Sequence, residues 1–202
     1  MFALVDKSDN SITRMLNGNR GIQIGDLKYP RAIYTLWTEA ERNAINIYEV
    51  TIDTSKRKDE EWYINTNITY SFDGTNATGS YGDATARAHA DANFTAEDEE
   101  NGKGTEGELK SKGLKTVLIR NVKLNAANEL SKTDWYVVRK SEESTAIPSA
   151  ITTHRRLVRS RQAAMETSIT NASDTPALET LYTYTRDSDG VSSRPLAEIP
   201  IL

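Results

Sequence analysis

The chain has 202 residues, a net charge of −4 and no cysteine, which bounds it to one or two domains and excludes disulfides, thiolate metal sites and a cysteine nucleophile. Only 37% of its residues are apolar and 7% are aromatic, so we expect modest cores beneath a large polar surface. No run approaches the ~18 consecutive apolar residues that a membrane-spanning helix needs, and residues 1–6 reach an acid too early for the apolar region of a signal peptide. We therefore expect no membrane insertion.

Residues 1–95 are predicted to form a small β-rich domain with one short helix, giving an α+β protein. Segment 17–21 holds two glycines and two asparagines and is typical of a turn, because both residue types tolerate positive φ. Short apolar runs and alternating apolar and polar residues, both of which indicate strands, occur at residues 1–5, 22–24, 47–52, 62–64 and 68–72.

The short helix is expected to run from Glu39 to Ile45. Thr38 and Glu41 have the spacing of a capping box, in which the hydroxyl of Thr38 accepts from the amide of residue 41 and the carboxylate of Glu41 accepts from the amide of residue 38. Farther along, residues 84–93 are rich in alanine and predict a helical arm with a thin apolar face.

Residues 96–107 are predicted to be an acidic, glycine-rich linker. They contain three glycines and a run of four acids, a composition that leaves nothing to bury. Residues 1–106 carry 11 Lys/Arg and 18 Asp/Glu, whereas residues 107–202 carry 14 and 11. The sequence therefore predicts two domains of opposite net charge, −7 and +3.

Residues 108–185 are predicted to form a helical domain. Leucine and valine recur at helical spacing over residues 114–130 and predict a first long helix. Pro148 suits the first turn of a second long helix, because its φ is fixed. The apolar stripe of that helix is predicted to consist of Ile151, Val158, Met165 and Ile169. We expect the two helices to pack antiparallel, as a hairpin, with Trp135 as the plug between them.

Three further segments complete the prediction. Residues 135–138 are expected to be a second short helix or an extended segment, and residues 176–182 a last short helix. Residues 186–202 are predicted to be an extended tail, apolar over residues 195–202.

The sequence offers little that would support catalysis. The two histidines, His89 and His154, have no second ligand three or four residues away, and no Gly-x-Ser-x-Gly elbow or phosphate-binding glycine loop occurs. Residues 187–190 resemble part of a calcium loop, but either register of that loop lacks required ligands, so a turn is predicted. We expect a non-enzyme with no catalytic residue, no cofactor and no metal ligand.

The chain has one basic cluster, at residues 154–161. Arg155 and Arg159 lie one turn apart on a helix and would suit phosphate groups. Against nucleic acid, the whole protein is acidic and the hairpin lacks a tight glycine-containing turn. A solvated face or a surface for an acidic protein partner is the preferred interpretation.

Three parts of the chain carry a family resemblance. They are Trp37–Ile45, Trp62–Asn67, and Thr133–Arg139 followed by Ile147–Ala150 and Arg155–Arg159. Together they resemble small structural proteins encoded in the tail regions of tailed bacteriophages, including marine phages of cyanobacteria. A similar Asp-Trp-centred helical hairpin recurs in phage tail-fibre assembly and tail-assembly-chaperone-like proteins. The resemblance spans residues 27–181 and departs at Asn46, where similar sequences tend to carry glycine.

The resemblance implies a virion structural protein without enzymatic activity. It would be a connector in the tail or baseplate, or a fibre-attachment component, acting by protein–protein binding in several symmetric copies. Its partners would be other tail or fibre proteins, and it would be assembled in the host cytoplasm and retained in the virion tail. Two alternatives stay open: a fibre-assembly chaperone that leaves before the particle is finished, and a small DNA-binding protein.

Eight residues are candidates for structural or partner-binding roles. They are Trp37, Glu41, Trp62, Asp134, Trp135, Pro148, Arg155 and Arg159. Asp134 is expected to cap the segment that begins at Trp135, and Trp135 is expected to bury a ring of ~150–250 Å² between the long helices. Trp37 and the short helix after it are expected to close the base of the sheet.

Overall fold

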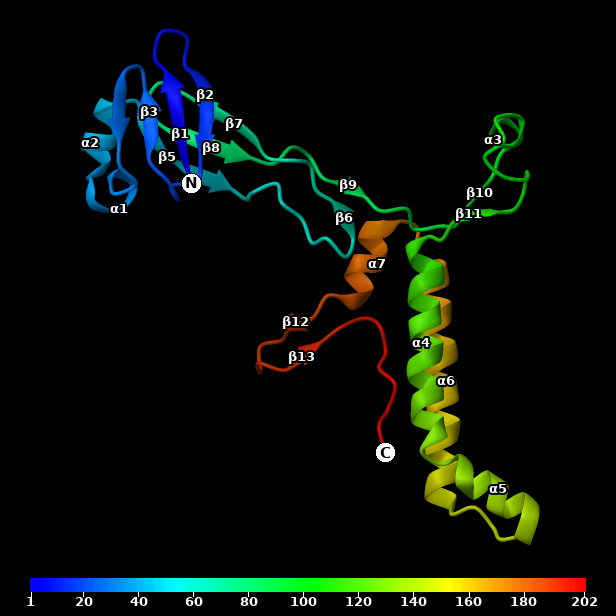
Figure 1. Ribbon diagram of the computed structural model, residues 1–202. Helices are drawn as coiled ribbons and strands as arrows, with labels where there is room; N and C mark the ends of the chain where they lie inside the picture. The colour runs from blue at the N-terminus through cyan, green and yellow to red at the C-terminus, as the bar shows by residue number, and fades with distance from the viewer. The chain divides into compact units, whose positions relative to one another are not determined.

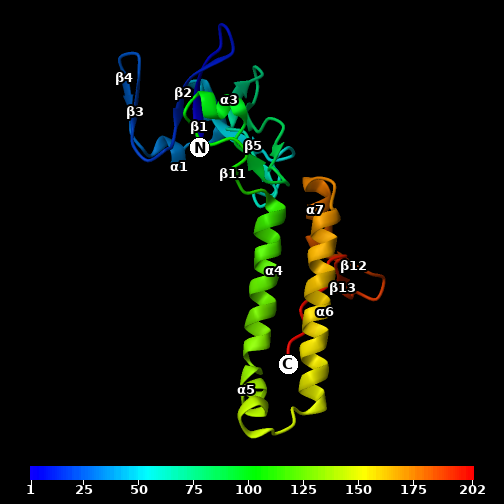
Figure 2. The same cartoon turned by 90° about the vertical axis from the view of Figure 1, so that its right-hand side faces the viewer.

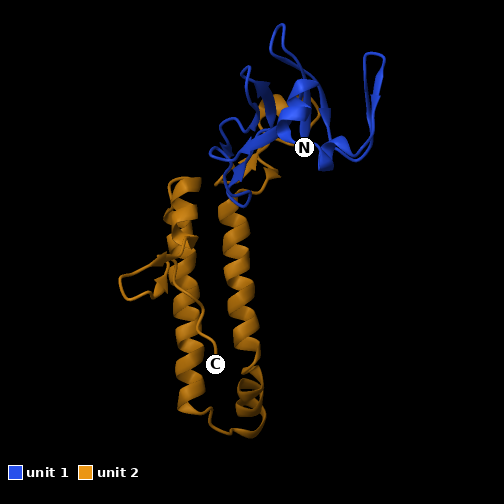
Figure 3. Cartoon of the chain, turned by 90° about the vertical axis from the view of Figure 1, so that its left-hand side faces the viewer, with its two compact units in different colours: residues 1–85 blue, residues 86–202 orange.

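The computed structural model describes residues 1–202 and has the predicted α+β fold class. It divides into two compact units, Met1–Thr85 (unit 1) and Ala86–Leu202 (unit 2), which Figure 3 shows in different colours. Unit 1 is β-rich, and unit 2 is dominated by helices. None of the helices is long and apolar enough to cross a membrane.

Unit 1 is built on a five-stranded sheet of order β2-β1-β5-β8-β7. Its strands are β1 (Phe2–Asp6), β2 (Ser11–Leu16), β5 (Ile47–Asp53), β7 (Thr69–Phe72) and β8 (Ala77–Ser80). Neighbouring strands are antiparallel except β5 and β8, which pair in parallel. The edge strands β2 and β7 approach each other, so the sheet is nearly closed.

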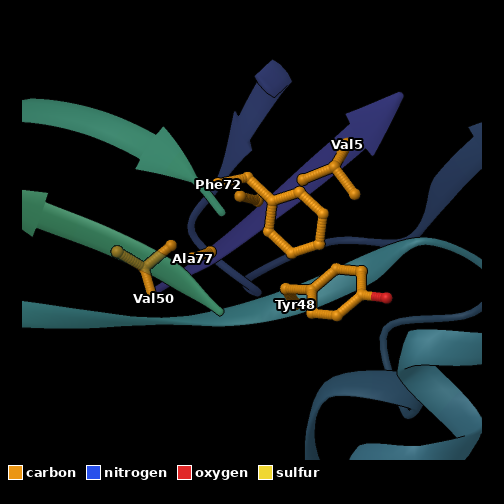
Figure 4. Packing of buried hydrophobic residues seen from close by; sticks show 6 residues of the cluster. Val5, Tyr48, Val50, Phe72 and Ala77 are labelled. Carbon is orange, nitrogen blue, oxygen red and sulfur yellow. The ribbon is translucent and has the colours of Figure 1, made fainter. Parts of the chain in front are cut away.

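Alternate residues of these strands contribute to two hydrophobic clusters. Figure 4 shows the first, in which the rings of Tyr48 and Phe72 lie 4.5 Å apart between centroids and pack with Val5, Val50 and Ala77. The second cluster comprises Leu16, Ile22, Ile33, Tyr34 and Ile47. Because side chains alternate across a strand, the neighbours Ile47 and Tyr48 serve different clusters.

The predicted short helix is confirmed as α2 (Glu39–Ala44), and its capping box forms between Thr38 and Glu41. A four-residue helix before it, α1 (Ile33–Leu36), was not predicted. Asn46 follows α2 with φ of 60°, a left-handed conformation that asparagine tolerates. The remaining strands of this part of the chain are β3 (Ile22–Ile24), β4 (Leu27–Tyr29), β6 (Tyr63–Ile64) and β9 (Thr85–Ala86).

Two predictions for the middle of the chain need revision. The predicted helical arm over residues 84–93 is wrong: that segment holds β9 and β10 (Ala92–Asn93). Tertiary hydrogen bonds outweigh the helical preference of alanine, because the carboxylate of Asp91 accepts from the amide of Gly113 at 2.7 Å. The predicted linker, residues 96–107, lies within unit 2 and contains α3 (Ala96–Glu100), between β10 and β11 (Leu109–Ser111).

The division between units also changes the charge balance. Residues 1–85 carry 9 Lys/Arg and 12 Asp/Glu, and residues 86–202 carry 16 and 17. The predicted contrast of −7 and +3 depends on assigning the acidic residues 97–106 to the first half. Counted by unit, the net charges are −3 and −1, so the units do not have opposite signs.

A long helical hairpin forms the centre of unit 2. It consists of α4 (Leu114–Ser131), α5 (Asp134–Glu143) and α6 (Ser149–Asn171). Helices α4 and α6 lie side by side, and α5 lies at the end where the chain reverses (Figures 1 and 2). The predicted long helices and their packing as a hairpin are confirmed.

The seam between α4 and α6 has heptad-like spacing. The predicted α6 stripe of Ile151, Val158, Met165 and Ile169 is buried. The buried positions of α4 are Leu118, Val122, Ala126 and Glu129. Val117 and Leu124, which also contributed to the predicted pattern of α4, are instead exposed on another face of the helix.

The end of the chain packs against the rest of unit 2. Helix α7 (Thr175–Tyr182) confirms the predicted last helix, and the carboxylate of Asp174 caps it by accepting from the amide of Ala177. The predicted turn at residues 187–190 joins β12 (Thr185–Arg186) to β13 (Ser192–Ser193). Leu196 in the extended segment after β13 is fully buried, and its amide donates to the carbonyl of Leu181 at 3.0 Å.

Candidate protein-binding surface

One buried arginine joins the three helices of the hairpin. Arg155, on α6, donates from Nη1 to the carbonyl of Leu130 at 2.8 Å and to Oγ1 of Thr133 at 2.7 Å. The same nitrogen lies 2.9 Å from Oδ1 of Asp134. The guanidinium therefore connects the last turn of α4 and the first turn of α5 to α6, and charge-assisted bonds of this kind are among the stronger ones in proteins.

The plug between the helices is Thr133, not Trp135. Thr133 is fully buried, whereas the side chain of Trp135 is 51% exposed. The reason lies in the spacing: Ala126, Glu129 and Thr133 follow one another at three and four residues and so continue the buried stripe of α4. A residue two positions after Thr133 points to the opposite side of a helix. The prediction that Trp135 is buried is therefore wrong.

Trp135 lies instead in an exposed aromatic and cationic group. Its ring lies 3.8 Å from that of Tyr136 between centroids, with 31° between the planes. The guanidinium of Arg139 lies 4.7 Å from the centroid of the Trp135 ring, within the range of a cation–π interaction. No residue of α5 is buried.

Trp135, Val138 and Arg139 share one face of α5, since they are three and four residues apart; we call this face the α5 surface. Val138 is 52% exposed. The face thus combines an exposed valine with an aromatic ring and a guanidinium, and Trp and Arg are enriched at protein interfaces and carry much of their binding energy.

Asp134 and Pro148 lie at the N-terminal ends of α5 and α6. Asp134 is not the cap that the sequence predicted: the N-cap of α5 is Thr133, and its side chain makes no capping bond. Asp134 is the first helical residue, where a negative charge complements the helix dipole, and it pairs with Arg155. Pro148 was predicted in the first turn of the return helix and lies one position earlier, at the N-cap of α6, whose first helical residue is Ser149.

A buried carboxylate, that of Glu129, lies in the seam one helical turn before this junction. Glu129 is 4% exposed and accepts from Nζ of Lys132 at 2.5 Å and from the amide of Leu202 at 2.8 Å, and it lies 3.1 Å from Nε2 of His154. The bond from Lys132 lowers the pKa of Glu129 most, with further lowering from Leu202 and His154. Sequence reasoning missed this residue, because the predicted pattern of this helix counted only leucine and valine and so placed neither Ala126 nor Glu129 in the seam.

The three candidate residues in unit 1 contribute to packing or to helix capping. Trp37 packs edge-on against Tyr29, 5.9 Å apart between centroids, and its carbonyl accepts from Arg42 at 2.5 Å. Glu41 caps α2, and its bond from the amide of Thr38 lowers the pKa of its carboxyl. Trp62 is 4% exposed. Trp37 directly precedes Thr38, the N-cap of α2, and Glu41 lies in the first turn of that helix. All three candidates therefore have a packing or capping role.

The basic cluster is divided by burial. Arg155 is committed to the hairpin junction, whereas Arg159, one turn later, is exposed together with Arg156 and Arg161. Arg155 therefore is not available to a phosphate, and the predicted phosphate-gripping pair of Arg155 and Arg159 does not form.

Comparison of the chain with protein-family models, with curated proteins and with solved structures found no match in any of the three.

Proposed function

We propose that this protein is a non-enzymatic structural component of a bacteriophage tail that binds another tail or fibre protein through the α5 surface. The observation that carries the binding role is the exposure of Trp135 and Val138 on a helix that buries none of its own residues. The assignment to a phage tail depends on the family resemblance of the stretches around Trp37, Trp62 and Asp134.

An exposed tryptophan of this kind has a high capacity for binding. A large aromatic ring buries 150–250 Å² when covered, and apolar area removed from water contributes roughly 25 cal/mol per Å². Covering the ring of Trp135 would remove the half of its surface that faces water. Its stack with Tyr136 and Arg139 already orders the side chain, which reduces the entropy cost of binding.

The hairpin presents this surface in a defined position. At 1.5 Å per residue, the 18 residues of α4 and 23 of α6 form arms of about 27 and about 35 Å. Figure 2 shows α5 at the reversal of these arms. Because Arg155 bonds to both flanks of the α4–α5 junction, α5 is held in a defined orientation, as a connector requires.

The absence of cysteine allows a site-specific test. Val138→Cys, labelled with a benzophenone maleimide, would carry a photo-cross-linker on the α5 surface, and Ser160→Cys would carry the same label on exposed α6 as the matched control. During particle assembly, illumination should join the α5-labelled protein to one tail or fibre protein, and the control should give little of that product. Equal cross-linking from both positions would contradict a binding role for α5.

Mass spectrometry of washed particles tests the virion assignment. A structural component should be present at a fixed ratio to other tail proteins. A protein that cross-links to a fibre protein in infected cells but is absent from finished particles would be the assembly chaperone, and the structural assignment would fail.

A further inference from the structure

Helix α4 carries a second apolar stripe, on a face other than its seam with α6. Val117 and Leu124 lie seven residues apart on it and are 43% and 49% exposed. A shallow groove runs along this face, lined by Thr116, Ile119, Arg120, Lys123, Leu124 and Ala127. We call it the α4 groove. None of the buried seam residues of α4 lines this groove, and only Lys123 on its rim reaches α6, through Glu166.

The groove lies on a basic part of the molecule. Residues 114–171, which form the hairpin, carry 10 Lys/Arg and 5 Asp/Glu. Lys123 is only loosely paired, 3.5 Å from Glu166, and Arg120 makes no ion pair. The buried Glu129 is the only acid of α4, so every exposed charge on that helix is positive.

We propose that the α4 groove binds an acidic amphipathic helix of a partner protein, which would add a third helix to the hairpin. Its apolar residues would cover Ile119 and Leu124, and its acidic residues would face Arg120 and Lys123 on the rim. This is a helix-in-groove mode, in which apolar anchors supply affinity and flanking charges select the partner.

Charge favours such a partner over a second copy of this chain. Two copies that met through their α4 grooves would bring Arg120 and Lys123 of both chains together, and like charges at an interface oppose association. The short acidic helix α3 of another copy, AEDEE, has no apolar stripe to fill the groove. A helix of another protein that has both an apolar stripe and flanking acidic residues would complement the groove.

The proposal does not depend on the function proposed for the α5 surface, because the two surfaces share no residue. Its test uses two fluorescent peptides of roughly 20 residues, long enough to form several helical turns. Both have leucine at the seam positions; one has glutamate and the other lysine at the flanking positions. Fluorescence polarisation with the full chain should show the glutamate peptide binding at least about tenfold more tightly, a difference of about 1.4 kcal/mol.

Three variants locate the binding. Leu124→Glu should abolish binding of the glutamate peptide, whereas Leu157→Glu, at an exposed leucine of α6, should leave it unchanged. The double variant Arg120→Glu and Lys123→Glu should reverse the preference toward the lysine peptide. Circular dichroism of each variant checks that the hairpin stays folded, which exposure of all four side chains favours.

Several results would overturn the proposal. Equal affinity for both peptides would show that the groove does not select its partner by charge. Equal loss of binding in Leu124→Glu and Leu157→Glu would show that the peptide does not bind at the α4 groove. Sedimentation that shows a dimer of the wild-type chain, dissociated by Leu124→Glu, would identify a second copy as the occupant.

Discussion

The guanidinium of Arg155 lies 2.9 Å from the carboxylate of Asp134 and donates to the buried hydroxyl of Thr133 at 2.7 Å. One side chain of α6 therefore holds the place where α4 ends and α5 begins. Since Asp134 is itself largely exposed, the local consequence of losing Arg155 is set mainly by the buried acceptors that it satisfies.

Replacing Arg155 tests this relationship. Arg155→Met keeps an apolar side chain of similar length but removes the charge-assisted bonds to the carbonyl of Leu130 and the hydroxyl of Thr133. The carbonyl of Leu130 still accepts from the amide and the hydroxyl of Thr133. We expect the free energy of unfolding of the hairpin to fall by about 1–3 kcal/mol, the contribution of hydrogen bonds from a charged donor at a buried junction. Urea unfolding followed by circular dichroism measures the change. The exposed Arg159→Met should stay within about 0.5 kcal/mol of wild type, and equal midpoints for all three proteins would contradict the assigned role.

The packing of α6 gives a second prediction. Ile169 is fully buried, whereas Leu157 is 43% exposed. Ile169→Ala should therefore lower the free energy of unfolding by about 2–5 kcal/mol through lost burial and a residual cavity, and Leu157→Ala should have little effect. The same urea titration measures both variants. A larger loss in Leu157→Ala would mean that α6 is rotated about its axis.

Local patterns in the sequence were sufficient where each residue's neighbours decide its structure. The capping box of Thr38 and Glu41 formed as predicted because both bonds lie within one turn. The α6 stripe from Ile151 to Ile169 was predictable because its spacing is regular and each position is apolar.

Other features required knowledge of partners distant in sequence. Size and apolar character suggested that Trp135 was the plug, but its angular position on the helix excludes it from the seam. The true seam residues there, Thr133 and Arg155, are polar and look like surface residues in sequence. Their burial is acceptable because they bond to each other and to the carbonyl of Leu130. Their spacing places them in the seam, but their polarity hides them from a search for apolar periodicity.

The same limit applies to the segment before the hairpin. Alanine-rich residues 84–93 favour a helix by propensity alone, yet the carboxylate of Asp91 bonds to the amide of Gly113. A Cβ atom at Gly113 would lie 2.2 Å from the carbonyl carbon of Ala90. This close approach of two backbones could not be read from composition.

The buried carboxylate of Glu129 predicts a pH dependence. Its pKa is lowered from its ordinary value of 4.5, first by the bond from Lys132. A carboxyl group whose pKa is lower in the folded state stabilises that state above its unfolded pKa, and this contribution is lost as the pH falls through the folded pKa. The difference in unfolding free energy between wild type and Glu129→Gln should therefore be constant from neutral pH to about pH 6 and shrink below about pH 4.5.

Urea titrations from about pH 7 to about pH 3 measure that difference. Glu142→Gln, at an exposed position near the end of α5, is the matched control and should stay within about 0.5 kcal/mol of wild type at neutral pH. A difference between wild type and Glu129→Gln that does not change over this range would show that Glu129 has no altered protonation equilibrium in the folded chain.

The exposure of Trp135 predicts its response to a quencher. In the double variant Trp37→Phe and Trp62→Phe, Trp135 is the only tryptophan left, and its half-exposed ring should be quenched efficiently by acrylamide and emit at long wavelength. The variant Trp135→Phe retains Trp62, which is 4% exposed, and the partly buried Trp37, so its quenching constant should be several times smaller. If the lone Trp135 instead emitted at short wavelength and resisted quenching, the ring would be buried, and the α5 surface would lose the residue on which its proposed binding role depends.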